Sequence, residues 1–589
     1  MPDDLRRTSQ FLLPLYKEEP APDGYDIYPV YPLTSGAMAS GYADLAMDLA
    51  PHRLVLIDGY AGIFWDEFRA GLSNEFRKLG LKANWILTSD YFKPEEQINR
   101  MTEPFLGGDD PIFGYRSDLE LKDWFDFPGD IGTADPARAM TLILGSGAFL
   151  FSPAGYRVYV DLPKNELQFR SRAGSISNLG ASAAIEPKPA YKRFYFVDWP
   201  VLNRHKKRFL PLIDLIVDGQ RPGDPVFTSG EALRNSLGAA GRGLFRVRPW
   251  FEPGPWGGQW IRSRIKGLNS EVINYAWSFE LIVPENGLIF TQSGLMLEVS
   301  FDFLMFQAGE LVLGIHHAVY GDEFPIRFDF LDTFGGGNLS VQCHPLPEYM
   351  KSRFGERFTQ EECYYILDAA EDATCYLGFQ ENIDPVSFRS DLERSFRSSE
   401  PVDIARHVQV HPSKRHDFFL IPPGTVHGSG INNLVLEIST TPYIFTFKMY
   451  DWLRMDLDGK PRPLNISRAM ENLCFDRKGR YVEENLISKP VMIETGAGWE
   501  LWQLPTHEKH SYEVFRYRFS GSVRVETKGR CHVLSLVEGT SMTVEVQGGV
   551  TGHFQYAETL VVAAAARGYT LVNEGAGDAM VVVVVAMMK

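Results

Sequence analysis

The chain contains little cysteine and no hydrophobic run long enough to cross a membrane. Its 5 cysteines are scattered over 589 residues and form no Cys-x-x-Cys pair. An odd, scattered set is typical of reduced thiols, which argues against a disulfide framework and favours a cytoplasmic protein. The longest apolar run, residues 579–588, is too short to span a bilayer. The first residues also lack the apolar stretch of a signal peptide.

Positive charge is scarce as well. The chain has 59 lysines and arginines against 75 aspartates and glutamates, so its formal net charge is −16. Its dense basic cluster, residues 205–208, is of the kind that usually forms a solvated helix face. Nucleic-acid binding needs a basic surface that neutralises phosphates, and the composition therefore argues against a nucleic-acid partner. An acidic chain that binds a small anion has to gather positive charge locally.

The first part of the chain has the pattern of a parallel α/β sheet. A short apolar run, residues 54–58, is followed by a glycine turn and then by a helix pattern whose apolar face contains Trp65, Phe68, Leu72, Phe76 and Leu79. Strand, turn and helix in this order predict the start of a parallel sheet. Further strands are expected from the apolar runs at residues 85–87, 141–144, 158–160, 194–197 and 212–217.

This order of elements resembles that of small P-loop kinases that act on nucleosides or sugars. A working phosphate loop needs a lysine that reaches the outer phosphates and a hydroxyl that holds magnesium. Here the glycine turn leads into Ile63, Phe64, Trp65 and Asp66, which supply neither group. We therefore expect no phosphoryl transfer by this part. A scaffold, a sugar sensor and a strand–turn–helix unit without any ligand all remain open.

Three short segments in the second half carry residue types that bind metals. Gln342 and His344 alternate in Leu-Ser-Val-Gln-Cys-His-Pro, so on a strand both side chains point to one face. A Pro-x-Gly-x-x-His turn delivers His427 to the start of a following strand. Glu362 lies between the two segments. Two histidines, a carboxylate and an amide oxygen suit a divalent ion such as zinc.

Each of these motifs has an ordinary interpretation. A single Gln-x-His is usually the polar face of a strand, and a single Pro-x-Gly-x-x-His is usually a loop. Their occurrence together with Glu362, in a region dense in short strands and turns, favours one metal site per chain. Cys343 alternates to the opposite face and is assigned to core packing. His507 and His510 lack the spacing of a His-Glu-x-x-His helix and are interpreted as ordinary residues.

From about residue 248 to 473 the chain resembles the class I mannose-6-phosphate isomerases, which are zinc enzymes of the cupin type. The resemblance is carried by residues 255–258, 278–280, 339–345, 362, 365–369, 418–427 and 450–452. It implies that Gln342, His344, Glu362 and His427 bind the zinc ion. It also implies an intramolecular oxidoreductase that interconverts an aldose and a ketose, most favourably mannose 6-phosphate and fructose 6-phosphate, through a cis-enediolate.

Such an isomerase needs a base for the carbon-bound proton and positive charge for the oxygen that becomes anionic. Glu437 matches the carboxylate that family members place on the strand after the metal histidine, and we expect it to act as acid and base. Lys448 stands where the family has an arginine, and we expect it to stabilise the charge. The ordinary alternatives are a structural ion pair for Glu437 and a solvated lysine.

Two departures from the family pattern concern the substrate. The chain has Asp329 where family members carry a lysine, so a cation expected near an anionic substrate is replaced by an anion. Lys448 keeps the charge of the family arginine but loses its bidentate fork. Arg327, on the same strand face, is expected either to replace the missing cation or to pair with Asp329. A non-catalytic metal- and sugar-binding sensor or assembly protein, and an isomerase of another sugar, therefore remain alternatives.

The expected fold is multidomain. An N-terminal α/β domain with a parallel sheet, resembling a degenerate P-loop kinase, is predicted for residues 1–246. A metal-binding cupin barrel is predicted for 247–376 and 411–487, with a helical insertion at 377–410. A second cupin-like β domain is predicted for 488–589, because short strands and glycine turns continue to a buried last strand.

Overall fold

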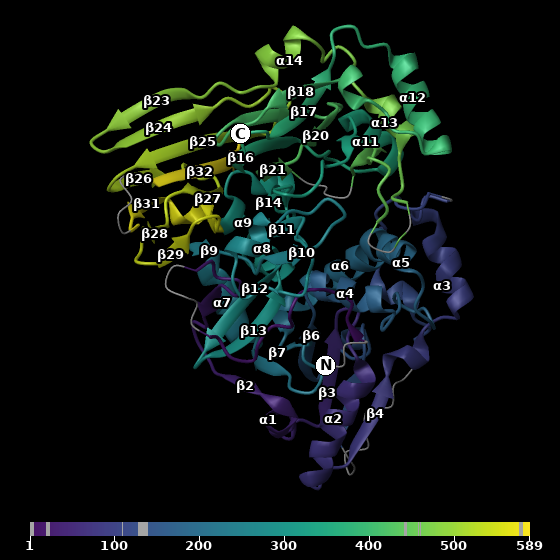
Figure 1. Ribbon diagram of the computed structural model, residues 1–589. Helices are drawn as coiled ribbons and strands as arrows, with labels where there is room; N and C mark the ends of the chain where they lie inside the picture. Colours follow the sequence, from purple (N-terminus) through teal and green to yellow (C-terminus); the bar gives the residue numbers. More distant parts are fainter. Residues whose placement is uncertain are drawn as a thin grey trace.

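The computed structural model describes residues 5–18, 24–108, 110–127, 140–440, 445–456, 459, 461–575 and 581–589. Within these residues the chain forms a mixed α/β part followed by several antiparallel sheets. In Figure 1 the α/β part lies at the bottom, and the last strands (yellow) lie at the left. None of the described helices has the length and apolar character needed to cross a membrane. We call the described residues up to 246 the N-terminal unit.

The N-terminal unit contains a seven-stranded sheet in the order β2-β8-β7-β6-β3-β5-β4. Five strands run parallel: β3 (Leu54–Gly59), β4 (Ala83–Leu87), β5 (Met140–Leu144), β6 (Tyr156–Asp161) and β7 (Leu215–Asp218). At one edge β8 (Val226–Ser229) and β2 (Met38–Ser40) are antiparallel. The apolar runs of β3 and β5 are almost wholly buried, as parallel strands require. The parallel sheet predicted from the sequence is therefore confirmed.

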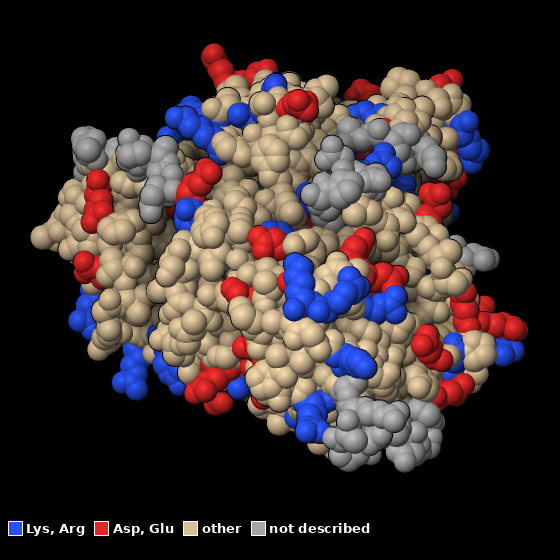
Figure 2. Space-filling model, turned by 90° about the horizontal axis from the view of Figure 1, so that it is seen from below, with Lys and Arg blue, Asp and Glu red and all other residues tan. Residues whose placement is uncertain are grey.

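The helices of this unit follow the same logic. α2 (Trp65–Lys78) comes directly after the glycine turn and buries Phe68, Leu72 and Phe76 from the predicted apolar face. The other helices of the unit are α1 (Gly41–Leu49), α3 (Glu95–Thr102), α4 (Lys164–Ala173), α5 (Pro187–Arg193), α6 (Trp199–Phe209) and α7 (Gly230–Ala240). On the face seen in Figure 2, Lys and Arg side chains lie among Asp and Glu side chains.

One predicted strand is wrong. Residues 194–197 lie in the helical segment η6 (Phe194–Asp198), which joins α5 to α6 without a break. All five residues of η6 are buried. A short apolar run that is buried on every side has no amphipathic period, so its pattern does not separate a strand from a helix.

The predicted metal residues lie in two antiparallel sheets, which we call the metal barrel. The first sheet has the order β10 (Trp250–Glu252), β11 (Trp277–Leu281), β14 (Ile326–Asp332), β21 (Asn433–Thr440), β16 (Glu362–Ala369) and β19 (Phe418–Ile421). The second has the order β18 (Val408–Pro412), β17 (Thr374–Phe379), β20 (His427–Ser429), β15 (Val341–Cys343) and β22 (Phe447–Tyr450). Such antiparallel sheets are consistent with a cupin-type fold.

Several helices accompany these sheets. Between β17 and β18 lies α12 (Pro385–Ser398), whose N-terminus is capped by the Asp384 side chain. The others are α8 (Trp260–Arg264), α9 (Asp302–Leu313), α10 (His317–Tyr320), α11 (Pro347–Phe354), α13 (Ile466–Asn472) and α14 (Arg480–Asn485). Helix α12 falls within the segment predicted as a helical insertion, and the domain boundaries themselves stay a prediction.

The end of the chain forms a second pair of antiparallel sheets. One has the order β23 (Val491–Gly496), β24 (Trp499–Leu504), β25 (Tyr512–Phe519), β32 (Val581–Met588), β27 (His532–Glu538), β30 (Thr559–Val562) and β9 (Leu244–Phe245). The other has the order β26 (Ser522–Glu526), β31 (Gly568–Asn573), β28 (Ser541–Val546) and β29 (Thr551–Gln555). Every residue of β32 is buried, as expected for the apolar run near the end of the chain.

Parts that are distant in sequence are interleaved. A three-stranded sheet pairs β1 (Val30–Pro32) in parallel with β12 (Gly287–Gln292), which pairs with β13 (Leu295–Ser300). Strand β9 of the N-terminal unit pairs with β30 of the last module. The N-terminal unit therefore contributes strands to sheets on both sides of its own end.

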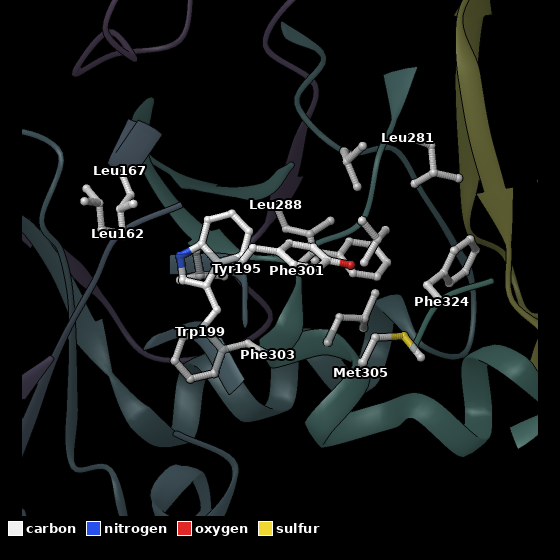
Figure 3. Close-up of a cluster of buried hydrophobic side chains, with 14 of the residues drawn as sticks. Leu162, Leu167, Tyr195, Trp199, Leu281, Leu288, Phe301, Phe303, Met305 and Phe324 are labelled. Atoms are coloured by element: carbon white, nitrogen blue, oxygen red, sulfur yellow. The ribbon is translucent and has the colours of Figure 1, made fainter. Parts of the chain in front are cut away.

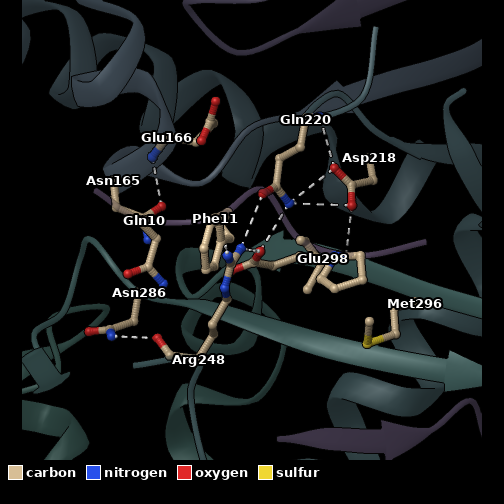
Figure 4. Close-up of polar contacts among 12 residues, drawn as sticks. Gln10, Phe11, Asn165, Glu166, Asp218, Gln220, Arg248, Asn286, Met296 and Glu298 are labelled. Atoms are coloured by element: carbon tan, nitrogen blue, oxygen red, sulfur yellow. Dashed lines mark hydrogen bonds and ion pairs between the residues drawn. The ribbon is translucent and has the colours of Figure 1, made fainter. Parts of the chain in front are cut away.

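An apolar cluster and a polar network hold the N-terminal unit against the rest of the chain. Trp199 and Tyr195 share a buried cluster with Phe301, Phe303 and Met305 (Figure 3). In the polar network, Arg248 pairs with Glu298 at 2.7 Å, and Gln220 Nε2 donates to the same carboxylate at 2.9 Å (Figure 4). Because buried charges need matched partners, such a network favours one relative placement of the parts.

Candidate metal centre

Two histidines and a glutamate meet inside the metal barrel. His344 Nε2 lies 2.6 Å from Glu362 Oε2, and His427 Nε2 lies 3.0 Å from the same oxygen. The candidate ligand atoms lie within 4.8 Å of one another. All three side chains are buried, with exposed fractions of at most 1%. β15 ends just before His344, whereas β16 and β20 begin at Glu362 and His427, so strand ends set their positions.

Backbone carbonyls orient both imidazole rings. His344 Nδ1 lies 3.2 Å from the carbonyl oxygen of Phe445, and His427 Nδ1 lies 2.9 Å from that of Thr425. In each contact Nδ1 carries the proton and donates, because a carbonyl oxygen only accepts. The Nε2 lone pair of each ring is then directed at the shared centre. This second hydrogen bond is the usual arrangement for a metal-binding histidine.

The charge states suit a cation. Burial raises the pKa of Glu362, but the adjacent His344 and His427 outweigh this and hold it well below its ordinary value. Burial lowers the pKa of His344. A carboxylate beside a neutral imidazole is the protonation state in which these groups bind a divalent ion. Within the described part of the chain, Glu362 Oε1 is buried and has no hydrogen-bond partner.

Gln342 lies beside this cluster. It is paired with His427 across β15 and β20, and its Nε2 lies 3.3 Å from His427 Nε2. Its Oε1 accepts a hydrogen bond from Ser340 Oγ at 3.2 Å. The two ends of an amide are assigned from such contacts, and a half-turn of the amide would present the oxygen to the centre instead. Its place as a fourth ligand stays a prediction.

A cavity of about 370 Å³ adjoins the cluster. Four of the six site residues predicted from the sequence line it, namely Gln342, Glu362, Glu437 and Lys448. His344 and His427 reach it through Glu362. The wall also contains Trp256, Trp277, Phe279, Arg327, Asp329, Gln360, Arg462 and Asn465. The cavity therefore brings side chains of both sheets of the metal barrel to one space.

Two further carboxylates face each other across this cavity wall. Glu437 on β21 is the register partner of Asp329 on β14. Burial and then the charges of Asp329 and Glu362 raise the pKa of Glu437 well above its ordinary value. Burial is also the main cause that raises the pKa of Asp329 to about 7, against the lowering effect of Arg327. Buried carboxyl groups of this kind can hold and release a proton near neutral pH.

Arg327 and Gln360 orient Glu437. Arg327 Nη2 lies 3.4 Å from Glu437 Oε1, and Gln360 Nε2 donates to the same oxygen at 3.3 Å. The sequence left Arg327 either as a replacement cation or as the partner of Asp329. The structure gives it an ion pair with Glu437, and its side chain also lines the cavity.

Lys448 lies on β22 as the register partner of Gln342. Burial lowers the pKa of its amine to about 7, and the nearby Arg462 lowers it further, while Asp451 opposes the change. Arg462 itself pairs with Asp451 at 3.1 Å. The cavity wall therefore carries cations at Lys448, Arg462 and Arg327 beside the carboxylates.

Sequence reasoning missed the wall residues that come from elsewhere in the chain. Ile112, Phe113 and Tyr191 of the N-terminal unit line the cavity, as do Arg462 and Asn465. None of them lies in a recognisable motif, and only the packing of distant segments brings them to the cavity. The proline- and glycine-rich segment that contains Trp256 was noticed, but not as part of a site.

Comparisons with known proteins give different results for the two halves. A family model described as "Domain of unknown function (DUF8485)" matches residues 41–242. The chain is 26% identical over 292 residues to mannose-6-phosphate isomerase ManA of Bacillus subtilis, a match that covers 50% of this chain and 84% of ManA. It is 27% identical over 307 residues to the mannose-6-phosphate isomerase of Streptococcus mutans, covering 51% and 85%.

Solved structures of such isomerases also align. A mannose 6-phosphate isomerase from Bacillus subtilis aligns with 19% identity and a TM-score of 0.46, covering 58% of this chain and 99% of that one. A zinc-bound mannose 6-phosphate isomerase aligns with 13% identity and a TM-score of 0.45, covering 59% and 100%. By the sequence matches, about half of the chain is similar to mannose-6-phosphate isomerases, while the N-terminal part matches a family of unknown function and its likeness to kinases stays a prediction.

Proposed function

We propose that the chain is a zinc-dependent aldose–ketose isomerase whose favoured pair is mannose 6-phosphate and fructose 6-phosphate. The observation that carries the proposal is the buried His344, Glu362 and His427 cluster in the wall of a cavity that also holds Glu437 and Lys448. Similarity to mannose-6-phosphate isomerases over about half of the chain supports the same reaction class.

The donor set fits a zinc ion. Two imidazole nitrogens freed by their backbone contacts and one carboxylate are common zinc ligands. The buried, unpartnered Oε1 of Glu362 is a second observation in favour, since such an atom is costly without a cation or donor nearby. When bound, zinc supplies a Lewis acid that polarises the oxygens of the sugar.

The protein's own groups move the protons. In the proposed reaction the Glu437 carboxylate takes the proton from C2 of the aldose and returns it to C1, so the group ends as it began. Arg327 and Gln360 hold the carboxylate in place for both steps. Lys448 lies on the opposite sheet and stabilises the oxygen that becomes anionic in the enediolate.

The cavity can accept a sugar phosphate. Its volume of about 370 Å³ is in the range of small-molecule sites. Trp256 and Trp277 offer ring faces to the apolar side of a sugar, and Arg462 with Lys448 offers positive charge to a phosphate. These residues place apolar and cationic groups in one wall.

A second candidate is an isomerase of an uncharged sugar. The observation that favours it is Asp329, whose buried Oδ1 has no hydrogen-bond partner within the described residues. An extra carboxylate in the wall disfavours an anionic substrate and offers an acceptor to a sugar hydroxyl. The non-catalytic sensor remains the third outcome of the test.

The test offers the zinc-loaded full chain mannose 6-phosphate, mannose and a panel of aldoses and follows ketose formation. We expect fructose 6-phosphate from mannose 6-phosphate, with Glu437→Gln abolishing turnover while zinc stays bound. Ketose formed from free sugars alone would support the uncharged-substrate candidate. Binding of sugars without conversion of any of them would reject both isomerase proposals and leave the sensor.

A further inference from the structure

We propose that the N-terminal unit is a built-in part of the metal pocket, in which Phe113 positions the ligand His344 and Tyr191 limits the length of the substrate. The claim about Phe113 concerns metal binding alone, whereas the claim about Tyr191 rests on the proposed isomerase function. The proposal gives a role to a part of the chain whose sequence family has none described.

Phe113 acts on His344 through one intermediate residue. Its ring stacks on that of Phe445 with centroids 5.2 Å apart and planes within 11°. The carbonyl oxygen of Phe445 accepts the Nδ1 hydrogen bond of His344 at 3.2 Å. Phe196, also from the N-terminal unit, meets the Phe445 ring at 6.3 Å. The unit thus holds the residue whose backbone fixes the orientation of a metal ligand.

The segment around Phe113 is itself anchored to both parts of the molecule. Asp110 Oδ1 accepts hydrogen bonds from the backbone of Ile112 at 2.9 Å and of Phe113 at 2.7 Å. The same carboxylate pairs with Arg468 of α13, whose guanidinium lies over the Phe113 ring at 5.3 Å. Gly114 passes so close to Phe105 that a Cβ would meet its carbonyl oxygen at 2.3 Å. Phe113 is consequently a fixed contact, with 1% of its surface exposed.

Tyr191 forms the second contribution to the cavity. It lies on α5, lines the cavity and donates its hydroxyl hydrogen to Glu285 Oε1 at 3.1 Å. Its ring packs edge-on against Trp199 at 5.7 Å. Trp199 belongs to the apolar cluster shared with α9 (Figure 3). A ring held from two sides makes a rigid wall, and a rigid wall sets how long a ligand the cavity accepts.

The placement of the whole unit supports this role. The network of Asp218, Gln220, Arg248 and Glu298 fixes the end of β7 against β13, away from the cavity (Figure 4). Strand pairing of β1 with β12 adds a third connection. With the unit fixed at several points, Phe113 and Tyr191 reach the cavity in a defined position.

The test of Phe113 measures zinc affinity by chelator competition and the absorption spectrum of the cobalt form, both on the full chain. Phe113→Ala should weaken zinc binding by about tenfold and change the cobalt spectrum, because an outer residue that orients a ligand tunes the metal. Phe113→Leu keeps most of the packing volume and should stay close to the parent. The matched control is Phe76→Ala, which removes an equally buried ring from the same unit where it contacts Trp85.

Phe76→Ala should lower the melting temperature but leave zinc affinity and the cobalt spectrum unchanged. Equal loss of zinc affinity in the Phe76 and Phe113 variants would reduce Phe113 to a general stability residue and overturn the claim. Unchanged zinc affinity in folded Phe113→Ala would overturn it as well. Neither readout requires turnover, so an inactive parent protein would reject the isomerase proposal without touching this result.

The test of Tyr191 compares six-carbon and seven-carbon sugar phosphates. Tyr191→Ala should raise the relative kcat/KM for the longer substrate by about tenfold, with zinc affinity unchanged. Tyr191→Phe keeps the ring, loses only the hydrogen bond to Glu285, and should keep the parental preference. An unaltered preference in an active Tyr191→Ala variant would show that another residue sets the length.

Discussion

At the scale of single residues, His344, Glu362 and His427 make the strongest claim. They arise from different strands, yet their ligand atoms lie within 4.8 Å of one another. Replacing His344 or His427 by alanine should remove most bound zinc and any isomerase activity together, because a site that lacks a ligand loses both affinity and geometry. Elemental analysis of the purified variants measures this, and a full equivalent of zinc in both would contradict it.

Lys448 gives a second prediction at this scale. Lys448→Ala should lower kcat by about a hundredfold while KM changes much less, because a charge at the reacting oxygen matters most in the transition state. Lys448→Arg should retain activity, since arginine keeps the charge and adds a bidentate fork. Steady-state kinetics with mannose 6-phosphate decides the matter. Unchanged kcat in Lys448→Ala would move the stabilising charge to the metal or to Arg462.

Residues differ in how far the sequence predicts them. Gln342, His344 and His427 belong to local motifs, in which strand alternation and a proline–glycine turn already fix the direction of the side chains. Phe113 and Tyr191 belong to no motif, because only long-range packing brings them to the cavity. The partner of Arg327 was open for the same reason, since Glu437 lies on a strand far along the chain.

At the scale of elements, the glycine turn between β3 and α2 is occupied by the protein's own side chains. Arg170 Nη1 donates to the carbonyl oxygen of Gly62 at 2.7 Å, and its guanidinium lies over Phe64 at 4.3 Å. The Asp58 carboxylate accepts hydrogen bonds from the backbone of Gly147 and Phe149 at 2.8 and 2.9 Å. These contacts stiffen the turn and supply no free cation to a phosphate.

A large cavity nevertheless adjoins this turn. It measures about 700 Å³ and includes Asp66, Glu67 and Glu95 in its wall. Because three carboxylates repel a polyphosphate, ATP should bind weakly or not at all, and no phosphoryl transfer should occur. Titration calorimetry with magnesium and ATP checks this. Micromolar affinity that disappears when Gly59 or Gly62 is changed would reveal a working nucleotide site.

Elements were predicted best where their period is clear. The amphipathic face of α2 and the buried runs of β5 and β32 give unambiguous patterns. The segment η6 was assigned to a strand because a fully buried run lacks a period. The short helix α13 lies within residues 464–473, where the sequence also predicts a helix.

At the scale of the whole molecule, the sequence indicates the order of the parts but not their interleaving. A change in texture separates the α/β pattern from the short strands that follow. The pairings of β1 with β12 and of β9 with β30 join segments hundreds of residues apart, and no local pattern encodes them. The same long-range packing places part of the N-terminal unit in the wall of the metal pocket.

The buried ion pair between Arg248 and Glu298 tests how firmly the parts are joined. Arg248→Ala leaves Glu298 buried without its cation and should lower the stability of the chain by about 3 to 5 kcal/mol. Arg480→Ala removes an exposed partner of Glu484 and should leave stability unchanged. Urea unfolding followed by fluorescence compares the two. Equal stability of both variants would mean that the network does not hold the parts together.

Metal removal and restoration test the central claim most directly. The full chain is incubated with mannose 6-phosphate in buffered D₂O, and fructose 6-phosphate is followed by NMR before chelation, after it, and after zinc is returned. The account predicts that the ketose forms, that its formation stops with the chelator, and that zinc restores it, because the buried cluster and Glu437 share one cavity. Conversion that continues at the same rate in the metal-free protein, or a zinc-loaded protein that binds the sugar and never converts it, would contradict the account.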